Sequence, residues 1–370
     1  MKILVAFGTR PEAIKMCPVI CALKRQQNMK CVVCLTGQHR EMLLSVMERF
    51  HIEANYNLDV MKPNQALCEL TERLLSGIKG ILETEKPHMV LVHGDTTSAF
   101  AVALACFYQN IPVGHVEAGL RTYNLKEPFP EEFNRQVVDK VSALCFAPTM
   151  TAKENLISEG VTDEQIYVTG NTVIDAMRMT ISKDYTDDNL KWAEQSRWIL
   201  LTSHRRENIG EPMKHIFKAV RKIADRYKNI RFLYPVHKNP LVKKIADDIL
   251  QGHPRIRLIE SLDMDVFYNY MANCYFVMTD SGGVQEEAPS LGKPVLVLRN
   301  TTERPEGIEA GTLRLVGTDE ESIITNCCEL LDNEETYNSM SKANNPYGDG
   351  HASERIVETI IEWEGLRNIK

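Results

Sequence analysis

Residues 2–15, KILVAFGTRPEAIK, combine a strand with the start of a helix, and this combination indicates the fold of the whole chain. The apolar run ends at Gly8 and Thr9, and Pro11 then opens a segment with helical periodicity that continues to Lys24. Proline suits the first turn of a helix because the N–H group that it lacks would have no partner there. The stretch therefore predicts a buried strand that leads directly into a helix.

Units of this kind recur along the 370 residues. Their apolar runs are continuous rather than alternating, which is typical of strands buried on both faces of a parallel sheet. Alternation of such strands with helices predicts a doubly wound α/β fold. The predicted strands are 2–9, 30–37, 88–95, 111–119, 143–149, 166–171, 198–204, 230–237, 256–261, 274–281, 294–300 and 313–317. Segments with helical periodicity lie between most of the strands, and they include 11–24, 66–84, 98–108, 172–182, 213–227, 241–250 and 353–368.

The pattern is interrupted once, between Asn171 and Trp198, where residues 183–189 are polar. We therefore expect an N-terminal domain of residues 1–171, a C-terminal domain of residues 172–350, and a helix in residues 351–370 that packs back on the N-terminal domain. The two domains are expected to be Rossmann-like, with about six strands each, and to face each other across a cleft. Open α/β sheets bind ligands at the carboxyl ends of their strands, so we expect the chemistry there.

The composition excludes several classes of protein. The net charge of −7 argues against a nucleic-acid partner, which needs a basic surface. The longest apolar run, residues 99–107, is about half of the 18 or more residues that suggest a membrane span. The apolar stretch 3–7 is too short for a signal peptide and has no cleavage site, so we expect a cytoplasmic protein without a membrane partner.

The ten cysteines do not suggest a metal site. Cys31 and Cys34 form a CxxC pattern, but they lie in a predicted strand, where residues three apart point to opposite faces. No second CxxC completes a four-ligand set. We therefore expect reduced, structural thiols and no metal ion.

Acidic side chains lie at the ends of two predicted strands and at the start of a helix. Asp95 and Glu117 are at strand ends, and Glu131 lies in the first turn of the helix after Pro130. Carboxylates that converge from such positions raise one another's pKa and divide into an acid and a base. Each also has a structural alternative. Asp95 could cap the next helix, although the threonines after it could cap equally well. Glu117 could pair with Arg121, and Glu131 could interact only with the helix dipole.

Basic side chains follow the first strand of each half. Arg10 and Lys15 lie at the start of the first helix, where exposed N–H groups favour an anion. His204, Arg205 and Arg206 follow the strand 198–204 and could bind phosphate oxygens and neutralise a leaving anion. For both groups, a solvated polar turn is the structural alternative.

The stretch DSGGVQEEA, residues 280–288, is a candidate diphosphate site. Gly282 and Gly283 would let backbone N–H groups approach a diphosphate. Glu287, about a turn further along, could accept hydrogen bonds from ribose hydroxyls, and Arg304 adds a cation at the next strand end.

Two common nucleotide-binding motifs are absent from the sequence. No GxGxxG opens the first helix, which disfavours a nicotinamide cofactor. Gly292 and Lys293 are followed by proline, which excludes a Walker P-loop. A diphosphate site without either motif, in a cleft between two α/β domains, suggests a nucleotide-sugar enzyme of the glycosyltransferase-B architecture.

Nine motifs occur in a specific order. They are GTRPEAIK (8–15), TGQHREML (36–43), HGDTTS (93–98), HVEAGLRT (115–122), PFPEEFNR (128–135), SHRREN (203–208), DSGGVQEEAPSLGKP (280–294), TTERPE (301–306) and NPYGDGHASERI (345–356). Over essentially its full length, the chain resembles the bacterial non-hydrolysing UDP-N-acetylglucosamine 2-epimerases. The resemblance implies two Rossmann-like domains, usually in a homodimer, that interconvert UDP-N-acetylglucosamine (UDP-GlcNAc) and UDP-N-acetylmannosamine (UDP-ManNAc) without a cofactor.

The resemblance also implies roles for single residues. Those implied in catalysis are Asp95, Glu117, Glu131 and His204. Those implied in substrate binding are Arg10, Lys15, Leu262, Phe267, Ser281, Gly282, Gly283, Glu287 and Arg304. The family typically has Pro-Leu-Asp-Tyr where this chain has Ser261-Leu-Asp-Met264, and the backbone around Leu262 could still bind the base.

Some members of the family bind a second, regulatory UDP-GlcNAc through their TGQHR and VHxNP stretches. This chain has Gln38, His39 and His237 there, whereas Glu41 stands where related sequences often have glutamine. For the reaction itself we expect anti elimination of UDP to 2-acetamidoglucal, followed by re-addition. The product is expected to supply N-acetylmannosamine (ManNAc) units for surface polysaccharide. The alternatives are a hydrolysing epimerase that releases free ManNAc and a retaining glycosyltransferase.

Overall fold

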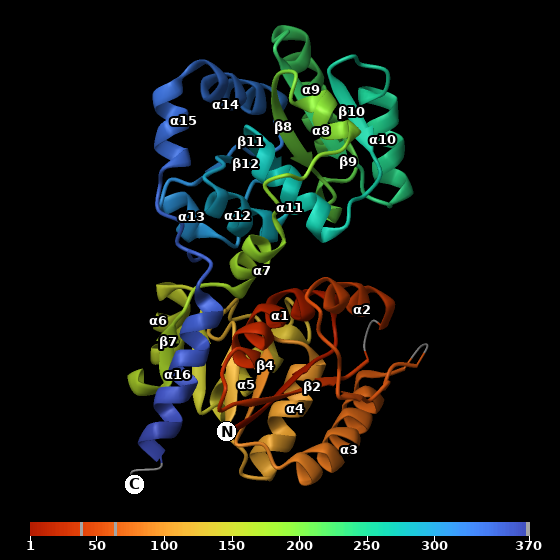
Figure 1. The fold of residues 1–370 in the computed structure, drawn as a ribbon. Coiled ribbons are helices and arrows are strands. Elements are labelled where there is room, and N and C mark those ends of the chain that lie inside the picture. Colours follow the sequence, from red (N-terminus) through yellow and green to blue (C-terminus); the bar gives the residue numbers. More distant parts are fainter. Residues whose placement is uncertain (38–39, 63–64, 368–370) are drawn as a thin grey trace. The chain divides into compact units, whose positions relative to one another are not determined.

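The structure is a computed structural model, and it describes residues 1–37, 40–62 and 65–367. The chain divides into two compact units (Figure 1). Unit 1 consists of Met1–Ala176 and Gly348–Lys370, and unit 2 consists of Met177–Tyr347. Within the described ranges, no helix is both long enough and apolar enough to cross a membrane.

Unit 1 contains a parallel sheet that has, over the described residues, seven strands in the order β3-β2-β1-β4-β5-β6-β7. The strands are β1 (Lys2–Phe7), β2 (Lys30–Leu35), β3 (Tyr56–Asn57), β4 (Met89–His93), β5 (Val113–Val116), β6 (Leu144–Ala147) and β7 (Ile166–Val168). The helices are α1 (Arg10–Lys24), α2 (Arg40–Arg49), α3 (Leu67–Glu85), α4 (Thr97–Tyr108), α5 (Glu131–Val141), α6 (Met150–Ser158), α7 (Thr172–Thr180), which spans the boundary between the units, and α16 (Ala352–Arg367). Every residue of β4 is buried, as expected for a strand covered on both faces.

Unit 2 contains a second parallel sheet, with six strands among the described residues in the order β10-β9-β8-β11-β12-β13. The strands are β8 (Arg197–Thr202), β9 (Ile230–Pro235), β10 (Ile256–Ile259), β11 (Phe276–Thr279), β12 (Val295–Val297) and β13 (Leu313–Leu315). The helices are α8 (Asp188–Ala193), α9 (Glu211–Arg226), α10 (Pro240–Leu250), α11 (Met264–Asn273), α12 (Gly282–Glu287), α13 (Pro305–Glu309), α14 (Glu320–Asp332) and α15 (Glu334–Ser341). Phe217, Phe232 and Phe276 lie in a large hydrophobic core of this unit.

The two sheets confirm the predicted fold class, two Rossmann-like α/β halves with parallel sheets. One strand was not predicted. Strand β3 has only two residues, Tyr56 and Asn57, which pair with Cys34 and Leu35 of β2. A strand this short leaves no apolar run in the sequence.

The turn from β1 into α1 is set by a capping box. The Thr9 side chain accepts a hydrogen bond from the N–H of Glu12 at 3.4 Å, and Glu12 Oε2 accepts from the N–H groups of Gly8 and Thr9 at 3.0 and 2.7 Å. Glu12 is therefore buried and structural. The cap fixes the start of the helix that carries Arg10 and Lys15.

The C-terminal helix α16 returns to unit 1. The buried carboxylate of Asp175 accepts hydrogen bonds from the N–H groups of Ala352 and Ser353 at 3.2 and 2.7 Å. A carboxylate at this end of a helix is favoured by the helix dipole. Helix α16 also packs against α1.

Candidate active site

The predicted carboxylates of unit 1 follow two adjacent strands. Strands β4 and β5 pair in parallel, with His93 opposite Val116. Asp95 and Glu117 therefore leave the same edge of the sheet from neighbouring strands, and the Glu117 carboxylate reaches the position of Gly94. Glu131 is the first residue of α5.

Glu117 lies at the centre of a cluster of donors. Its Oε2 atom contacts the Lys15 ammonium, accepts from Asn171 Nδ2 at 3.0 Å and lies 3.6 Å from Nε2 of the buried His93. Burial alone would raise the pKa of Glu117, but the charges of Lys15 and His93 hold it well below its usual range. Glu117 is therefore a carboxylate, and its backbone has an unusual positive φ of 67°.

The alternative that Glu117 pairs with Arg121 is wrong. The Arg121 guanidinium is buried against two other carboxylates, at 2.8 Å from Asp139 and 2.7 Å from Glu159. Arg121 therefore does not pair with Glu117, which forms its ion pair with Lys15 instead.

Asp95 does not cap a helix, so this alternative is also wrong. Thr96 caps α4, because its Oγ1 accepts from the N–H of Ala99 at 3.1 Å. The Asp95 carboxylate instead forms an ion pair with Arg135, and its backbone carbonyl accepts from Asn134 Nδ2 at 2.9 Å. The Asp95 side chain is 28% exposed, so it remains accessible.

The two acids at the start of α5 differ. Glu132 is fully buried, and its carboxylate accepts from the N–H groups of Thr122 and Tyr123 at 3.0 and 3.1 Å. Glu131 is half-buried, and its side chain makes no hydrogen bond or ion pair within the described part of the chain. Glu132 is thus structural, and Glu131 is available for chemistry.

In unit 2, Asp280 holds the loop that carries His204. Its fully buried carboxylate accepts from the Ser203 hydroxyl at 2.9 Å, from the N–H groups of His204 and Arg205 at 3.0 Å, and from the Asn208 amide at 2.9 Å. Because Asp280 follows β11 and the loop follows the adjacent strand β8, this contact ties two strand ends together.

The His204 ring stacks on the ring of His237, with centroids 5.4 Å apart and planes 17° apart. Burial lowers the pKa of His204, and although Asp280 acts in the opposite direction, His237 and Arg205 lower it further. His204 is therefore neutral at neutral pH. Gln38 and His39, the other predicted regulatory residues, lie outside the described residues.

The predicted diphosphate residues surround the start of α12. Ser281 precedes Gly282 and Gly283, the first residues of the helix. A Cβ atom on Gly282 would lie 2.9 Å from Glu303 Oε1, so a larger residue there would require the Glu303 side chain to move. Arg304 forms an ion pair with Glu286 through its Nε atom.

The predicted ribose and base residues also lie in unit 2. Glu287 accepts a hydrogen bond from the Tyr268 hydroxyl at 3.3 Å. Leu262 precedes helix α11 and Phe267 lies on it, and both are half-buried.

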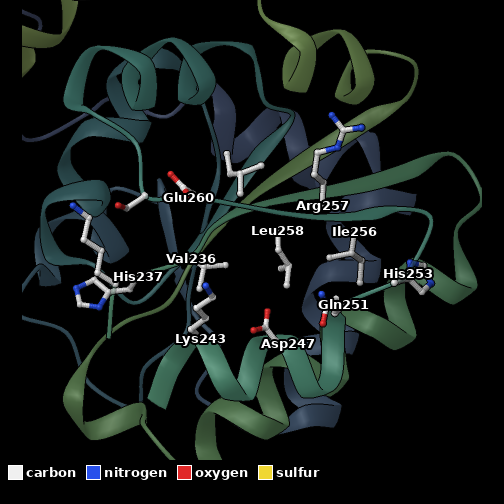
Figure 2. Close-up of a pocket in the computed structure, with 14 residues that line it drawn as sticks. Val236, His237, Lys243, Asp247, Gln251, His253, Ile256, Arg257, Leu258 and Glu260 are labelled. Carbon is white, nitrogen blue, oxygen red and sulfur yellow. The ribbon is translucent and has the colours of Figure 1, made fainter. Parts of the chain in front are cut away.

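A cavity of about 810 Å³ lies at the edge of the second sheet (Figure 2). Lys243 and Asp247 of α10, and Gln251 directly after this helix, face Ile256 and Leu258 of β10 across it. At the carboxyl ends of β9 and β10 it is lined by residues 236–238 and 259–261, and His237 is among them. The carboxyl ends of the strands are where α/β proteins bind ligands.

Together, two doubly wound α/β units with functional side chains at their strand ends define a nucleotide-sugar enzyme of the glycosyltransferase-B-like fold. The family model described as UDP-N-acetylglucosamine 2-epimerase matches residues 21–361. A Bacillus subtilis (strain 168) protein named UDP-N-acetylglucosamine 2-epimerase is 51% identical over 367 residues, covering 99% of this chain and 97% of the relative. The chain belongs to the UDP-N-acetylglucosamine 2-epimerase family.

Two solved structures of relatives have the same fold. The UDP-GlcNAc 2-epimerase of Neisseria meningitidis, bound to UDP-GlcNAc, has a TM-score of 0.84 and 49% identity over 98% of this chain and 100% of that chain. The structure of S. aureus MnaA with UDP has a TM-score of 0.87 and 49% identity over 99% of this chain and 97% of that chain.

Several residues that hold the candidate site were not predicted. They are His93, His115, Asn134, Arg135, Asp139, Asn171 and Asp280. Some lie inside the quoted motifs, which could have drawn attention to them. Asp139 and Asn171 lie outside every motif and carried no signal.

Proposed function

We propose that this protein reversibly epimerises carbon 2 of UDP-GlcNAc to give UDP-ManNAc, without hydrolysis, and supplies ManNAc units for surface polysaccharide. The single observation that carries the proposal is the family match: the family model covers residues 21–361, and a relative named UDP-N-acetylglucosamine 2-epimerase is 51% identical over 99% of this chain. The carboxylates at the strand ends of unit 1 and the glycine-containing turn of unit 2 support it chemically.

The proposed reaction proceeds by elimination and re-addition. The carbon 2 proton has no adjacent carbonyl, so direct deprotonation is very difficult. Departure of UDP from carbon 1 makes that carbon cationic and acidifies carbon 2. A carboxylate then removes the proton, and the products are 2-acetamidoglucal and UDP. Protonation of carbon 2 on the opposite face and return of UDP to carbon 1 complete the exchange.

Two faces of one carbon need two proton-transfer groups, and we propose that they come from among the three carboxylates of Asp95, Glu117 and Glu131. Glu117 is held ionised by Lys15, which suits a base or a charge that stabilises the cationic carbon 1, and does not suit the acid. Glu131 has no partner among the described residues and is our candidate for the acid.

The UDP group is assigned to unit 2. We propose that His204, Ser281, Gly282, Gly283 and Arg304 bind the diphosphate and stabilise it as it leaves. Glu287 would bind the ribose, and Leu262 and Phe267 the base. Arg10 and Lys15 would contact the substrate from unit 1. The Arg304 side chain is held by its ion pair with Glu286 and by a hydrogen bond that a terminal nitrogen donates to the Glu303 carbonyl at 3.1 Å.

Product analysis tests the proposal against its alternatives. The protein is incubated with UDP-GlcNAc alone, and the products are separated by chromatography. UDP-ManNAc supports the proposal. Free ManNAc and UDP in place of UDP-ManNAc would indicate a hydrolysing epimerase, and no reaction until an acceptor sugar is added would indicate a glycosyltransferase.

The proposal includes a regulatory UDP-GlcNAc site at Gln38, His39 and His237. The stack of His237 on His204 supports this site, because a ligand that contacts the His237 ring would change the surroundings of the His204 ring. Sigmoidal dependence of the rate on UDP-GlcNAc, and activation of the reverse reaction by traces of it, are expected. Hyperbolic kinetics in both directions would contradict this part.

We also propose a homodimer in the cytoplasm. Exposed aromatic side chains on α4 and α5 support the dimer: Phe107 is 56% exposed and Phe133 47% exposed, and Phe133 contacts Phe100 with ring centroids 5.7 Å apart. Aromatic groups are enriched at protein interfaces. Light scattering of the purified protein measures the oligomeric state, and a monomer would contradict the dimer.

A further inference from the structure

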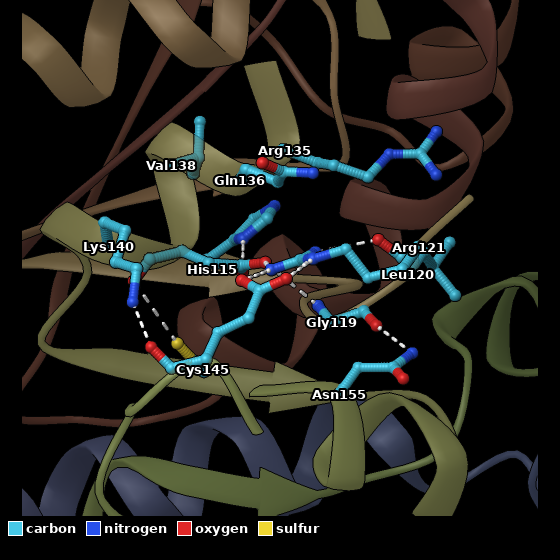
Figure 3. Close-up of polar contacts among 12 residues, drawn as sticks. His115, Gly119, Leu120, Arg121, Arg135, Gln136, Val138, Lys140, Cys145 and Asn155 are labelled. Atoms are coloured by element: carbon cyan, nitrogen blue, oxygen red, sulfur yellow. Dashed lines mark hydrogen bonds and ion pairs between the residues drawn. The ribbon is translucent and has the colours of Figure 1, made fainter. Parts of the chain in front are cut away.

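His115 is a fully buried histidine on β5, and Figure 3 shows it among the polar contacts around it. A close oxygen atom lies at each of its ring nitrogens. Nδ1 lies 2.6 Å from Oδ1 of Asp139, and Nε2 lies 2.7 Å from the backbone carbonyl oxygen of Gly94. A carbonyl oxygen can only accept a hydrogen bond, and so can an ionised carboxylate. Both ring nitrogens must therefore carry a proton if Asp139 is ionised.

The surroundings of Asp139 keep it ionised. Its other oxygen, Oδ2, lies 2.8 Å from Arg121 and accepts from the N–H of Gly119 at 3.3 Å. Burial raises the pKa of Asp139, but the charges of His115 and Arg121 outweigh it and lower the pKa. Arg121 is in turn bonded to Glu159 through two nitrogens, at 2.7 and 2.8 Å. Two cations and two anions thus balance in a buried network.

The carbonyl that His115 holds belongs to the peptide that joins Gly94 to Asp95. The N–H of Gly94 donates to the Val116 carbonyl at 2.9 Å, and the carbonyl of Asp95 accepts from Asn134 at 2.9 Å. The turn before the Asp95 side chain is therefore fixed at each polar group of Gly94. Helix α5 supplies both Asn134 and Asp139, so a single helix orients the turn directly and through His115.

We propose that His115 is a positioning residue for the epimerase reaction: its doubly protonated ring, oriented by Asp139, holds the Gly94–Asp95 peptide and so places the Asp95 carboxylate relative to Glu117. This inference rests on the proposed function. Glu117 is two residues after His115, so the ring links the strand that leads to Glu117 with the turn that carries Asp95. A buried ion pair that only stabilises the fold is the competing explanation.

Two amide variants separate these explanations. In His115→Asn, the amide nitrogen takes the place of Nδ1, which keeps the bond to Asp139 and loses the bond to Gly94. In His115→Gln, the amide nitrogen takes the place of Nε2, which keeps the bond to Gly94 and loses the bond to Asp139. Both variants remove the same charge, and they differ by one methylene group, which determines which bond survives.

The measurements are kcat for UDP-GlcNAc, the dissociation constant of UDP by calorimetry, and thermal unfolding. A misplaced catalytic group costs up to about 100-fold in rate, so we expect H115N to lose about 10- to 100-fold in kcat. H115Q should lose clearly less. UDP affinity should be unchanged in both, because the UDP residues lie in unit 2. The control His88→Asn, directly before β4, alters only the hydrogen bond that Nδ1 accepts from the N–H of Lys2 and should keep its kcat.

The outcomes decide the proposal. It is overturned if folded H115N keeps the wild-type kcat, or if H115Q loses as much as H115N. Should neither variant fold, proton NMR of the wild-type protein decides: one histidine ring with two slowly exchanging N–H protons supports the proposal, and the absence of such a ring overturns it. Wild-type protein that is inactive on UDP-GlcNAc would instead refute the proposed function.

Discussion

The ammonium group of Lys15 on α1 forms an ion pair with the carboxylate of Glu117 after β5, across 102 positions of the chain. The pair joins the turn after the first strand to the centre of the candidate site. It also keeps a buried carboxyl group ionised, which burial alone would oppose.

Replacement of Lys15 by methionine should therefore change the pH profile. Loss of the ammonium raises the pKa of Glu117, because burial remains and the main opposing charge is gone. The carboxylate is the active form of Glu117. As the pH is lowered, the variant should therefore lose activity at a higher pH than the wild-type protein does. The pH dependence of kcat/KM measures this, with Lys79→Met of the exposed Lys79–Glu83 pair as control. An acidic limb at the wild-type pH would argue against the assigned role of Lys15.

The carboxylates should be needed for turnover and not for UDP binding. Proton-transfer groups contribute about 10²–10⁴-fold, so Asp95→Asn, Glu117→Gln and Glu131→Gln should each lower kcat by a factor in this range. The dissociation constant of UDP should stay near the wild-type value. Kinetics and calorimetry on the same samples check both, and a large loss of UDP affinity in all three variants would contradict the division of roles.

Asp280 should matter for both stability and UDP binding. Asp280→Asn replaces acceptor oxygens that serve four donors of the 203–208 loop by an amide. Leaving buried donors unsatisfied costs about 1–3 kcal/mol, and we expect a decrease of this size in the free energy of unfolding. UDP affinity should fall as well, because His204 loses its support. Unchanged urea unfolding together with unchanged UDP affinity would contradict the proposed role of Asp280 in holding the 203–208 loop.

Gly282→Ala should disturb the proposed diphosphate site. The added Cβ would lie 2.9 Å from Glu303 Oε1 and 3.2 Å from a terminal nitrogen of Arg205, so this ion pair must move. We expect weaker UDP binding, measured by calorimetry. Gly365→Ala on α16 is the control, because a Cβ there meets no atom within 4 Å. Equal UDP affinity in G282A and the wild type would remove Gly282 from the site.

The sequence was sufficient for the fold class because its buried strands are long apolar runs followed by helix starts. In unit 1, Pro11 and the apolar run before it correctly predicted strand β1 and the helix α1 that follows it. The two-residue strand β3 escaped prediction, since two residues make no pattern.

The support of the site was harder to predict than its chemistry. Asp95 and Glu117 end apolar runs and are visible in the sequence, but their partners are not. Asp139 lies in a helix, 24 positions after His115, and looks like a solvated acid until the helix is packed on the sheet. Likewise, local spacing offered a pair between Arg121 and Glu117, four positions earlier, as the structural alternative, but Arg121 pairs instead with Asp139 and Glu159. Long-range pairing of charges depends on the folded arrangement, which local spacing does not contain.

The most direct test of the central claim is proton NMR of UDP-GlcNAc incubated with the protein in deuterium oxide. Elimination and re-addition predict that UDP-ManNAc forms with deuterium at carbon 2 and that the remaining UDP-GlcNAc gains deuterium at the same carbon over time. UDP-ManNAc that fully retains the original hydrogen at carbon 2 would contradict the account.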